Sequence, residues 1–426
     1  MVTKIGDNNN NLIIGSKDDD LLRGGDGKDT LVGLTGNDTL IGDKGDDLKF
    51  AGSGDDRLIW NNGDGSDRME GDWGYDVTEV NGAVDAGDDF ELRANQYRTE
   101  FERLNLGNFT LNVDNVEQFE IKGGSGDDTL NVKDLTGTDV QQVIFWGGEG
   151  NDTFDATEAN VTAIAYGDAG DDLLKGSSVP EITDTLNGGE GNDTIIGNKG
   201  DDLKIGGYGD DRLIWNNGDG SDIMEGDAGY DVTEVNGAVD AGDDFELRAN
   251  QYRTEFERLN LGNFTLDVDN VEQFEINGGG GDDTLTVKDL TGTDVQQVLF
   301  NGGDGNDYLD ASYTEVKVIA DGGTGYDTLT GGHGDDLLKG GEGNDLLKGN
   351  AGADTFVVGL GVDTIVDFNY AEGDKIQIFA DELGISSYDG LSYNSSEHTL
   401  YWNQTELAVF DNSIAVFNIT ETIDIV

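Results

Sequence analysis

A nine-residue repeat is the feature that most restricts how this chain can fold. The first clear unit, at residues 24–32, reads GGDGKDTLV, and most further units follow at intervals of nine residues. The units form three arrays. Units of the first array begin at Gly24, Gly33, Gly42, Ala51, Asn62 and Gly71, those of the second at Gly188, Gly197, Gly206, Asn217 and Gly226, and those of the third at Gly322, Gly331, Gly340, Gly349 and Val358. A fixed short period is typical of solenoids, in which each repeat contacts only its neighbours.

A longer duplication contains the short repeats. Residues 36–155 align without gaps on residues 191–310, and 104 of the 120 aligned positions are identical. Whole blocks can be duplicated in register when a fold is quasi-one-dimensional, so this pattern also favours a solenoid. The predicted segments are a first array (1–79), an intervening block with isolated repeat turns (80–187), a second array (188–234), a second copy of that block (235–321), a third array (322–366) and a C-terminal cap (367–426).

Each unit joins a glycine-rich turn to a short strand. Glycines at positions 1, 2 and 4 permit positive φ and close approach of the backbone, and they leave carbonyl oxygens uncovered. In residues 30–32 the central leucine can point inward while its neighbours point outward. The aspartate at position 6 adds a carboxylate, and hard oxygen donors on a flexible turn suit calcium better than magnesium. For a single turn the alternative is a solvated Asx turn, but many copies in one register favour the metal site.

The composition excludes several other functions. The 89 acidic residues outnumber the 25 basic ones and give a formal charge of −64, which excludes nucleic acid as a partner because phosphate binding needs clustered basic side chains. With two histidines and no cysteine, the chain cannot form His-rich centres, disulfides or thiolate sites. The sequence shows no catalytic motif, no N-terminal signal peptide and no apolar stretch long enough for a transmembrane helix.

The repeats closely resemble those of the RTX (haemolysin-type) calcium-binding family, which is exported by type I secretion. The resemblance implies a parallel β-roll in which two units complete one coil and calcium, roughly 10 to 15 ions in all, lies between stacked turns. Asp29 would then share an ion with the turn that begins at Gly42. The implied ligands at position 6 are Asp29, Asp38, Asp47, Asp56, Asp67, Asp76, Asp193, Asp202, Asp211, Asp222, Asp231, Asp327, Asp336, Asp345 and Asp354. The implied site glycines are Gly24, Gly33, Gly42, Gly188, Gly197, Gly206, Gly331 and Gly340.

Some units depart from the pattern. Asn11 replaces the first position-6 aspartate, so the leading coil is expected to bind weakly or to act as a cap. Lys49 and Lys204 occupy the apolar position 8 of corresponding units. Thr78 and Thr233 also occupy position 8, in the last units of the first two arrays. We expect all four coils to be distorted. Isolated units lack a neighbour nine residues away and supply only candidate ligands, namely Asp128, Asp152, Asp172, Asp283 and Asp307.

The intervening blocks contain less glycine. Apolar and charged residues alternate at 90–94 and 109–113, which predicts strands, whereas residues 93–106 and 248–261 fit a helix face or a strand. The charged residues of this stretch indicate a solvated face and are Arg93, Arg98, Glu100, Glu102 and Arg103. We expect Trp60 and the equivalent Trp215 to have a packing role at strand ends, and the alternative is that they stack on sugar.

The C-terminal segment resembles the cap that follows RTX arrays in secreted proteases and lipases. Apolar residues at 400–402 and 407–410 flank Asn403 and Gln404, which predicts a hairpin over the exposed edge of the solenoid. The chain ends with an acidic residue before two apolar ones, at 424–426. This ending is similar to the uncleaved C-terminal signal of type I export, and the alternative is an ordinary cap end.

The sequence therefore predicts an all-β fold, a parallel β-roll and β-helix solenoid with tandem nonapeptide repeats and a C-terminal β cap. We expect a secreted, calcium-binding structural or binding protein, extracellular or on the cell surface, without enzymatic activity and with polysaccharide as a candidate partner. The competing hypothesis is an extracellular lyase or epimerase of polysaccharides. Repeats that start near Met1 leave no obvious room for its catalytic domain. A pore-forming toxin is disfavoured, because the sequence contains no long apolar or amphipathic helical region.

Overall fold

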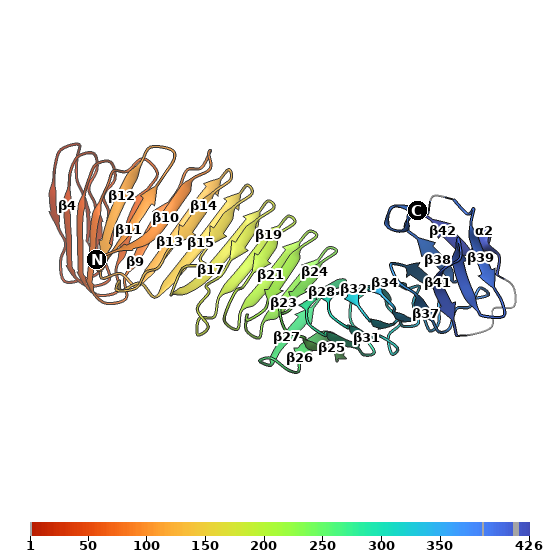
Figure 1. Cartoon of the computed structure of the whole chain (residues 1–426). Helices are drawn as coiled ribbons and strands as arrows, with labels where there is room; N and C mark the ends of the chain where they lie inside the picture. Colours follow the sequence, from red (N-terminus) through yellow and green to blue (C-terminus); the bar gives the residue numbers. More distant parts are fainter. Residues whose placement is uncertain (1, 386, 412–416) are drawn as a thin grey trace. The chain divides into compact units, whose positions relative to one another are not determined.

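The chain forms a nearly all-β structure built from parallel coils. The computed structural model describes residues 2–385, 387–411 and 417–426 and divides into two compact units, Met1–Leu213 and Ile214–Val426. Within each unit, short strands stack in parallel as successive coils of a solenoid (Figure 1). The described helices are the single turns α1 (Ala380–Leu383) and α2 (Ile419–Thr422). In the part of the chain that the structure describes, no helix has the length and apolar character needed to cross a membrane.

Two sheets run along the first unit. The strands of one sheet, all parallel to their neighbours, are β1 (Thr3–Ile5), β3 (Leu21–Arg23), β5 (Thr39–Ile41), β7 (Arg57–Asn61), β9 (Val77–Asn81), β13 (Gln118–Ser125), β15 (Gln142–Glu149), β17 (Thr162–Ala169), β19 (Thr185–Glu190) and β21 (Leu203–Tyr208). The strands of the other, in spatial order, are β2 (Leu12–Ile14), β4 (Thr30–Thr35), β6 (Leu48–Ser53), β8 (Arg68–Trp73), β12 (Phe109–Asp114), β11 (Arg98–Arg103), β10 (Asp89–Asn95), β14 (Thr129–Val132), β16 (Thr153–Asp155), β18 (Leu173–Lys175) and β20 (Thr194–Ile196).

The second unit repeats this arrangement after β22 (Arg212–Asn216), the strand that contains the division point. One sheet contains, in spatial order, β23 (Ile223–Ala228), β27 (Phe264–Asp269), β26 (Arg253–Arg258), β25 (Asp244–Asn250), β29 (Thr284–Val287), β31 (Tyr308–Asp310), β33 (Thr328–Thr330), β35 (Leu346–Lys348), β37 (Asp363–Ile365), β41 (Thr405–Phe410), β40 (Thr399–Trp402) and β39 (Leu391–Asn394). The other contains β24 (Val232–Asn236), β28 (Gln273–Gly280), β30 (Gln297–Asp304), β32 (Lys317–Gly325), β34 (Leu337–Gly343), β36 (Thr355–Val358), β38 (Lys375–Ile378) and β42 (Ile423–Ile425).

Stacked aliphatic side chains form the core of each array. Position 8 of the nonapeptide points inward, so Leu22, Leu40 and Leu58 occupy consecutive register positions on β3, β5 and β7 and are fully buried. Position 4 requires glycine for two reasons. Gly45 has a φ of 145°, and a Cβ added to it would lie 1.5 Å from the carbonyl oxygen of Gly27 in the preceding coil. The turns of adjacent coils therefore stack in close backbone contact.

An antiparallel hairpin interrupts the coils within each intervening block. In the first copy β10 pairs with β11, and β11 pairs with β12. Residues 93–106, and likewise 248–261, therefore consist of strands and turns rather than the helix that the sequence left open. The parallel coils continue on both sides, because β12 pairs with β8 and β10 pairs with β14. Trp60 is fully buried and stacks on Phe109 with ring centroids 3.8 Å apart, which confirms a packing role.

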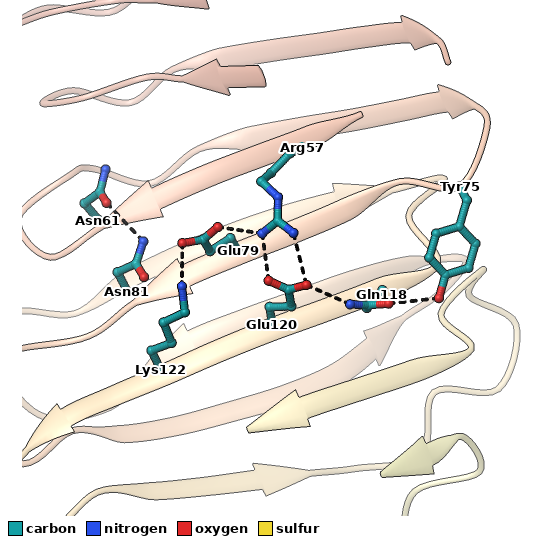
Figure 2. A network of polar contacts seen from close by, with 8 residues as sticks. All are labelled: Arg57, Asn61, Tyr75, Glu79, Asn81, Gln118, Glu120 and Lys122. Carbon is teal, nitrogen blue, oxygen red and sulfur yellow. Dashed lines mark hydrogen bonds and ion pairs between the residues drawn. The ribbon is translucent and has the colours of Figure 1, made fainter. Parts of the chain in front are cut away.

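A polar network joins coils on either side of this hairpin (Figure 2). Arg57 on β7 donates to Glu79 on β9 at 2.6 Å and to Glu120 on β13 at 2.7 Å. Lys122 on β13 donates back to Glu79 at 2.9 Å, and Gln118 donates to Glu120 at 2.9 Å. Three strands that precede and follow the hairpin in sequence are thereby held in one register.

The C-terminal cap closes both sheets of the second unit. β40 and β41 form the predicted hairpin, and its turn residues Asn403 and Gln404 have φ of 51° and 76°, as a two-residue turn with two positive φ values requires. β41 pairs with β37, and β42 pairs with β38. The last residues of the chain are therefore a strand of the solenoid sheet, with Ile423 fully buried.

Candidate metal centres

The position-6 aspartates form ladders that run along each unit. The backbone N–H of Asp29 donates to Asp47 Oδ1 at 2.7 Å, and that of Asp38 donates to Asp56 Oδ1 at 2.6 Å, each one coil further on. Every ladder aspartate is buried, with at most 3% of its surface exposed. In the first unit the ladders are Asn11–Asp29–Asp47–Asp67, Asp20–Asp38–Asp56–Asp76, Asp88–Asp128–Asp152–Asp172–Asp193–Asp211 and Asp184–Asp202. In the second they are Asp243–Asp283–Asp307–Asp327–Asp345–Asp363 and Asp336–Asp354–Asp374.

The conformation at position 2 divides these turns into two kinds. In open turns residue 2 has positive φ, as Gly25 does at 102° and Leu34 at 90°, and its N–H is turned away from the ladder carboxylate. In closed turns an N–H of the turn donates to the second carboxylate oxygen, as Ser16 does to Asp20 Oδ2 at 2.5 Å. The closed turns end at Asp20, Asp88, Asp184, Asp243, Asp336, Asp363 and Asp374.

Open turns leave a carboxylate oxygen without a donor. Among the described residues, Oδ2 is buried and has no hydrogen-bond partner at Asp29, Asp38, Asp47, Asp56, Asp76, Asp128, Asp152, Asp172, Asp193, Asp283, Asp307, Asp327 and Asp345. A buried acceptor of this kind costs about 1–3 kcal/mol, and more when it is charged. Such a row of unsatisfied carboxylates fits a series of bound cations.

Carbonyl oxygens converge with these carboxylates. A Cβ added to Gly33, at position 1 of its turn, would lie 2.3 Å from Asp38 Oδ2 and 2.4 Å from the carbonyl oxygen of Ala51 in the next coil. Position 1 is therefore glycine for the close approach that the sequence suggested, whereas the positive φ also suggested for it is absent. The approach of Oδ2, at 2.0–2.5 Å, recurs at the predicted glycines Gly24, Gly42, Gly188, Gly197, Gly331 and Gly340. Gly206 lies buried in β21.

This donor set suits calcium. Within residues 2–385, 387–411 and 417–426, no group of three or more His, Asp or Glu side chains is arranged to hold a metal ion. Each turn instead contributes one ladder carboxylate beside backbone carbonyl oxygens. Calcium accepts such mixed oxygen shells in flexible geometry, whereas magnesium demands a near-ideal octahedron.

Burial raises the pKa of the ladder carboxyls. Desolvation is the main cause, and neighbouring ladder carboxylates add to it, so that the pKa of Asp47 rises to about 7, that of Asp128 to about 7 and that of Asp172 to about 8. The bond that Oδ1 accepts from the preceding aspartate's N–H opposes this rise without cancelling it. Without a cation these groups are therefore partly protonated near neutral pH, and a bound cation would compete with that proton.

The structure corrects the prediction that isolated units lack in-register neighbours. Asp128, Asp152 and Asp172 stack directly on one another and continue into the second array at Asp193. Their coils contain 20 to 24 residues, so a search for neighbours nine residues away misses them. Spacing by whole coils would also have found four ladder members that the sequence missed, which are Asp20, Asp184, Asp363 and Asp374. Asp88 and Asp243, also missed, lie 40 residues from their ladder partners because the hairpin is inserted between them.

The expected distortion at Lys49 and Lys204 was wrong. Lys49 lies in regular register between Leu31 on β4 and Met69 on β8, and Lys204 pairs with Leu186 on β19. Both lysines are fully buried. The coils at Thr78 and Thr233 are likewise regular parts of β9 and β24, and both threonines are fully buried. A polar residue at position 8 is therefore accommodated without disturbing the coil.

A buried arginine pairs with one closed turn in each copy. Arg103 Nε lies 2.8 Å from Asp88 Oδ1, and the two side chains are 4% and 0% exposed. In the second copy Arg258 Nε lies 2.9 Å from Asp243 Oδ1, and these side chains are 3% and 0% exposed. The guanidinium of Arg103 also lies over the ring of Trp60, 5.5 Å from its centroid. Arg103 is thus a core residue and not part of the solvated face predicted for it.

Comparison with known proteins agrees with this geometry. The family model described as RTX calcium-binding nonapeptide repeat (4 copies) matches residues 5–40, 23–58, 144–163, 182–213, 275–287, 299–312, 319–347 and 334–365. No curated protein sequence matches the chain. Among solved structures, the extracellular lipase LipA from Serratia marcescens is similar at 16% identity and a TM-score of 0.16 over 60% of this chain, which spans 37% of the lipase's length. The chain thus carries matches to the RTX calcium-binding nonapeptide repeat in both of its units.

Proposed function

We propose that this protein is a secreted solenoid that folds on binding calcium and serves as a structural or binding scaffold without enzymatic activity. The observation that carries the proposal is the row of buried open-turn carboxylates, whose Oδ2 atoms have no described hydrogen-bond donor. Each is an unfavourable arrangement without a cation and a favourable one with it. The repeats would therefore order when calcium arrives.

The proposed ligands are the aspartates of turns with positive φ at position 2. They are Asp29, Asp38, Asp47, Asp56, Asp76, Asp128, Asp152, Asp172, Asp193, Asp202, Asp211, Asp231, Asp283, Asp307, Asp327, Asp345 and Asp354. Asp336, which the repeat pattern also implied, is omitted because its Oδ2 already accepts the N–H of Gly332 at 2.6 Å. Asp67 is omitted because Lys49 Nζ lies 2.9 Å from its Oδ2. Asp222, which the repeat pattern also implied, is omitted because it is the counterpart of Asp67 in the second copy.

Calcium binding of ordinary strength would dominate the stability of the fold. Extracellular calcium modules bind at about 10⁻⁴ to 10⁻³ M, so each site contributes about 0.4 to 1.4 kcal/mol at millimolar calcium. Ten sites would supply about 4 to 14 kcal/mol, comparable to the whole stability of a domain. Roughly 10 to 15 ions would also offset about 20 to 30 of the 64 net negative charges. Because millimolar calcium is found outside cells, the folded state would be favoured there.

Export by a type I apparatus would deliver the chain to that calcium. The C-terminal strand β42 ends in the acidic and apolar pattern of such signals, with Ile423 buried and Val426 55% exposed. Removing residues 367–426 should abolish appearance in the medium, and undiminished export of the truncated chain would contradict a C-terminal signal.

Far-UV circular dichroism tests calcium-dependent folding. The full chain is compared in chelator and in millimolar calcium, with magnesium at equal concentration as the control. We expect an incomplete β spectrum in chelator that increases with calcium and not with magnesium. A β spectrum that is complete in chelator and unchanged by calcium would contradict the proposal.

A groove favours polysaccharide binding as a second candidate role. It lies on the outer face of β28, β30, β32 and β34, in two parts of about 350 and 240 Å³ that share Asn301 and Asp321. Amide, carboxylate and aliphatic side chains line it, a mixture that suits sugar hydroxyls and ring faces. A screen against neutral and acidic polysaccharides, with turnover scored separately from binding, distinguishes a scaffold from a lyase or epimerase.

A further inference from the structure

A buried lysine fills one of the open turns. In turn 62–67 Gly63 occupies position 2 with a φ of 96°, so the turn is open. Lys49 Nζ nevertheless lies 2.9 Å from Asp67 Oδ2, and both side chains are 0% exposed. We propose that the Lys49 ammonium takes the place of calcium at this turn, so that the chain supplies its own cation there. This inference rests on the proposed function of the other open turns.

The position of the lysine in the coil explains how its ammonium reaches the turn. Its Cα stands in register between Leu31 and Met69, where other coils place an aliphatic residue, and its methylene groups continue that core. Its Cε would lie 2.9 Å from a Cβ added to Gly42, position 1 of the turn that ends at Asp47. The side chain therefore extends from the core into the region where consecutive ladder turns meet.

The contacts of the ammonium match the needs of the open turn. Asp67 Oδ2 is the counterpart of the oxygen that has no donor at Asp29 or Asp47, and here an ammonium forms an ion pair with it. The ammonium also donates to the carbonyl oxygen of Ile59 at 2.5 Å. One carboxylate and one carbonyl thus surround the ammonium, as the oxygens of other open turns would surround a metal. A divalent ion at the same place would face strong repulsion from a buried positive charge.

The second copy carries the same substitution. Lys204 occupies position 8 of the corresponding unit, is fully buried and lies in register with Leu186. The duplicated chain therefore retains a lysine at this one position of each copy, whereas position 8 of neighbouring units is aliphatic.

Counting bound calcium tests the inference directly. Lys49→Leu restores the aliphatic side chain of neighbouring units and leaves Asp67 in an open turn without its cation. We expect this full-length variant to bind one more calcium ion than the wild type, by native mass spectrometry and calorimetry. Lys28→Gln is the matched control, because it removes an exposed lysine paired with an exposed aspartate, and we expect it to leave the count unchanged. A wild-type count in Lys49→Leu would overturn the inference.

A double variant covers the case in which Lys49→Leu fails to fold. Lys49→Met combined with Asp67→Asn removes both charges together and should bind as many ions as the wild type. Loss of one ion in this variant would show that Asp67 is a calcium ligand and would overturn the inference. A wild type that binds no calcium at all would refute the proposed function as well. If the wild type binds calcium, an unchanged count in Lys49→Leu or the loss of one ion in the double variant refutes the lysine assignment alone.

Discussion

The tandem arrays and the hairpin insertions place aspartates in the same ladders but neutralise them differently. In the arrays Asp47 Oδ1 accepts the N–H of Asp29 at 2.7 Å, and its Oδ2 has no described donor. Beside the hairpin, Asp88 receives the N–H of Ala83 at 2.7 Å and a buried guanidinium from Arg103 at 2.8 Å. Open array turns such as that of Asp47 therefore need an external cation, whereas the hairpin turns contain their own.

This difference follows from what each region can supply. A nine-residue unit has room for one turn and one short strand, so all of its side chains near the turn come from the repeat itself. The hairpin adds strands β10 and β11, and with them an arginine that reaches back to the ladder. Both copies preserve this pair, since Arg258 contacts Asp243 at 2.9 Å. The comparison teaches that only part of the solenoid should depend on calcium.

Calcium removal should produce the largest effect. In chelator the array turns lose about 4 to 14 kcal/mol of stabilisation, whereas the hairpin turns keep their internal cations. Hydrogen exchange read by mass spectrometry should therefore show loss of amide protection over residues 20–76 and retained protection over residues 88–113. The second copy is an internal replicate, with residues 243–268 expected to remain protected. Equal loss in arrays and hairpins would contradict the comparison.

The thermal stability should depend on pH in opposite directions without and with calcium. Burial raises the folded-state pKa of Asp47 from 3.8 to about 7 and that of Asp172 to about 8, so protons bind the folded calcium-free chain more tightly than the unfolded one. Stability from these groups is complete below pH 4 and is lost progressively as the pH rises from about 4 to about 8. We expect the calcium-free Tm to fall by roughly 5–10 °C between pH 5 and 8.

Calcium-loaded protein is the control for this measurement. Calcium needs deprotonated carboxylates, so its Tm should rise over the same pH interval. A calcium-free Tm that increases with pH would show that the ladder carboxyls are not protonated in the folded state.

The sequence predicted the register of the repeats but not the state of each turn. Aspartate at position 6 and an aliphatic residue at position 8 identify the ladder and the core, because both recur at a fixed spacing. The open or closed state depends on φ at position 2, which residue type does not determine. Leu34 and Asp168 adopt positive φ there at 90° and 71°, whereas the N–H of Gly332 closes its turn.

Lys49 and Arg103 were not identified as internal cations from the sequence, for a related reason. Lys49 reads as a flaw in the repeat because its partner Asp67 lies two units away, beyond a two-residue insertion. Arg103 reads as a surface charge because it lies among other charged residues of β11. Its burial becomes evident only when the hairpin folds back on Asp88. Contacts of this kind depend on tertiary packing, which a local pattern does not contain.

Removing the hairpin arginine should have the next largest effect. Arg103→Met leaves Asp88 buried without its charged partner and should lower the free energy of unfolding in urea by about 3 kcal/mol. Arg258→Met should have an equal effect in the second copy. Arg93→Met is the control, since its side chain is 33% exposed and its loss should change stability by about 0–1 kcal/mol. If Arg103→Met matched this control, the guanidinium would not be what holds the hairpin turn.

The smallest expected effect comes from replacing the aspartate of a single open turn, which should change stability in opposite directions with and without calcium. Asp172→Asn removes one proposed ligand and should destabilise the calcium-loaded chain by about 0.4 to 1.4 kcal/mol. In chelator the Asp172 carboxyl must take up a proton or remain as a buried charge when the chain folds, and either is unfavourable, so its replacement by a neutral amide should stabilise the chain. Closed-turn Asp184 accepts N–H groups from Ser177 and Ala163 at 2.6 and 2.7 Å. Asp184→Asn should therefore destabilise by about 1 kcal/mol with or without calcium. Thermal unfolding of both variants in both buffers separates the cases, because only an open turn can make the same substitution harmful in one buffer and favourable in the other.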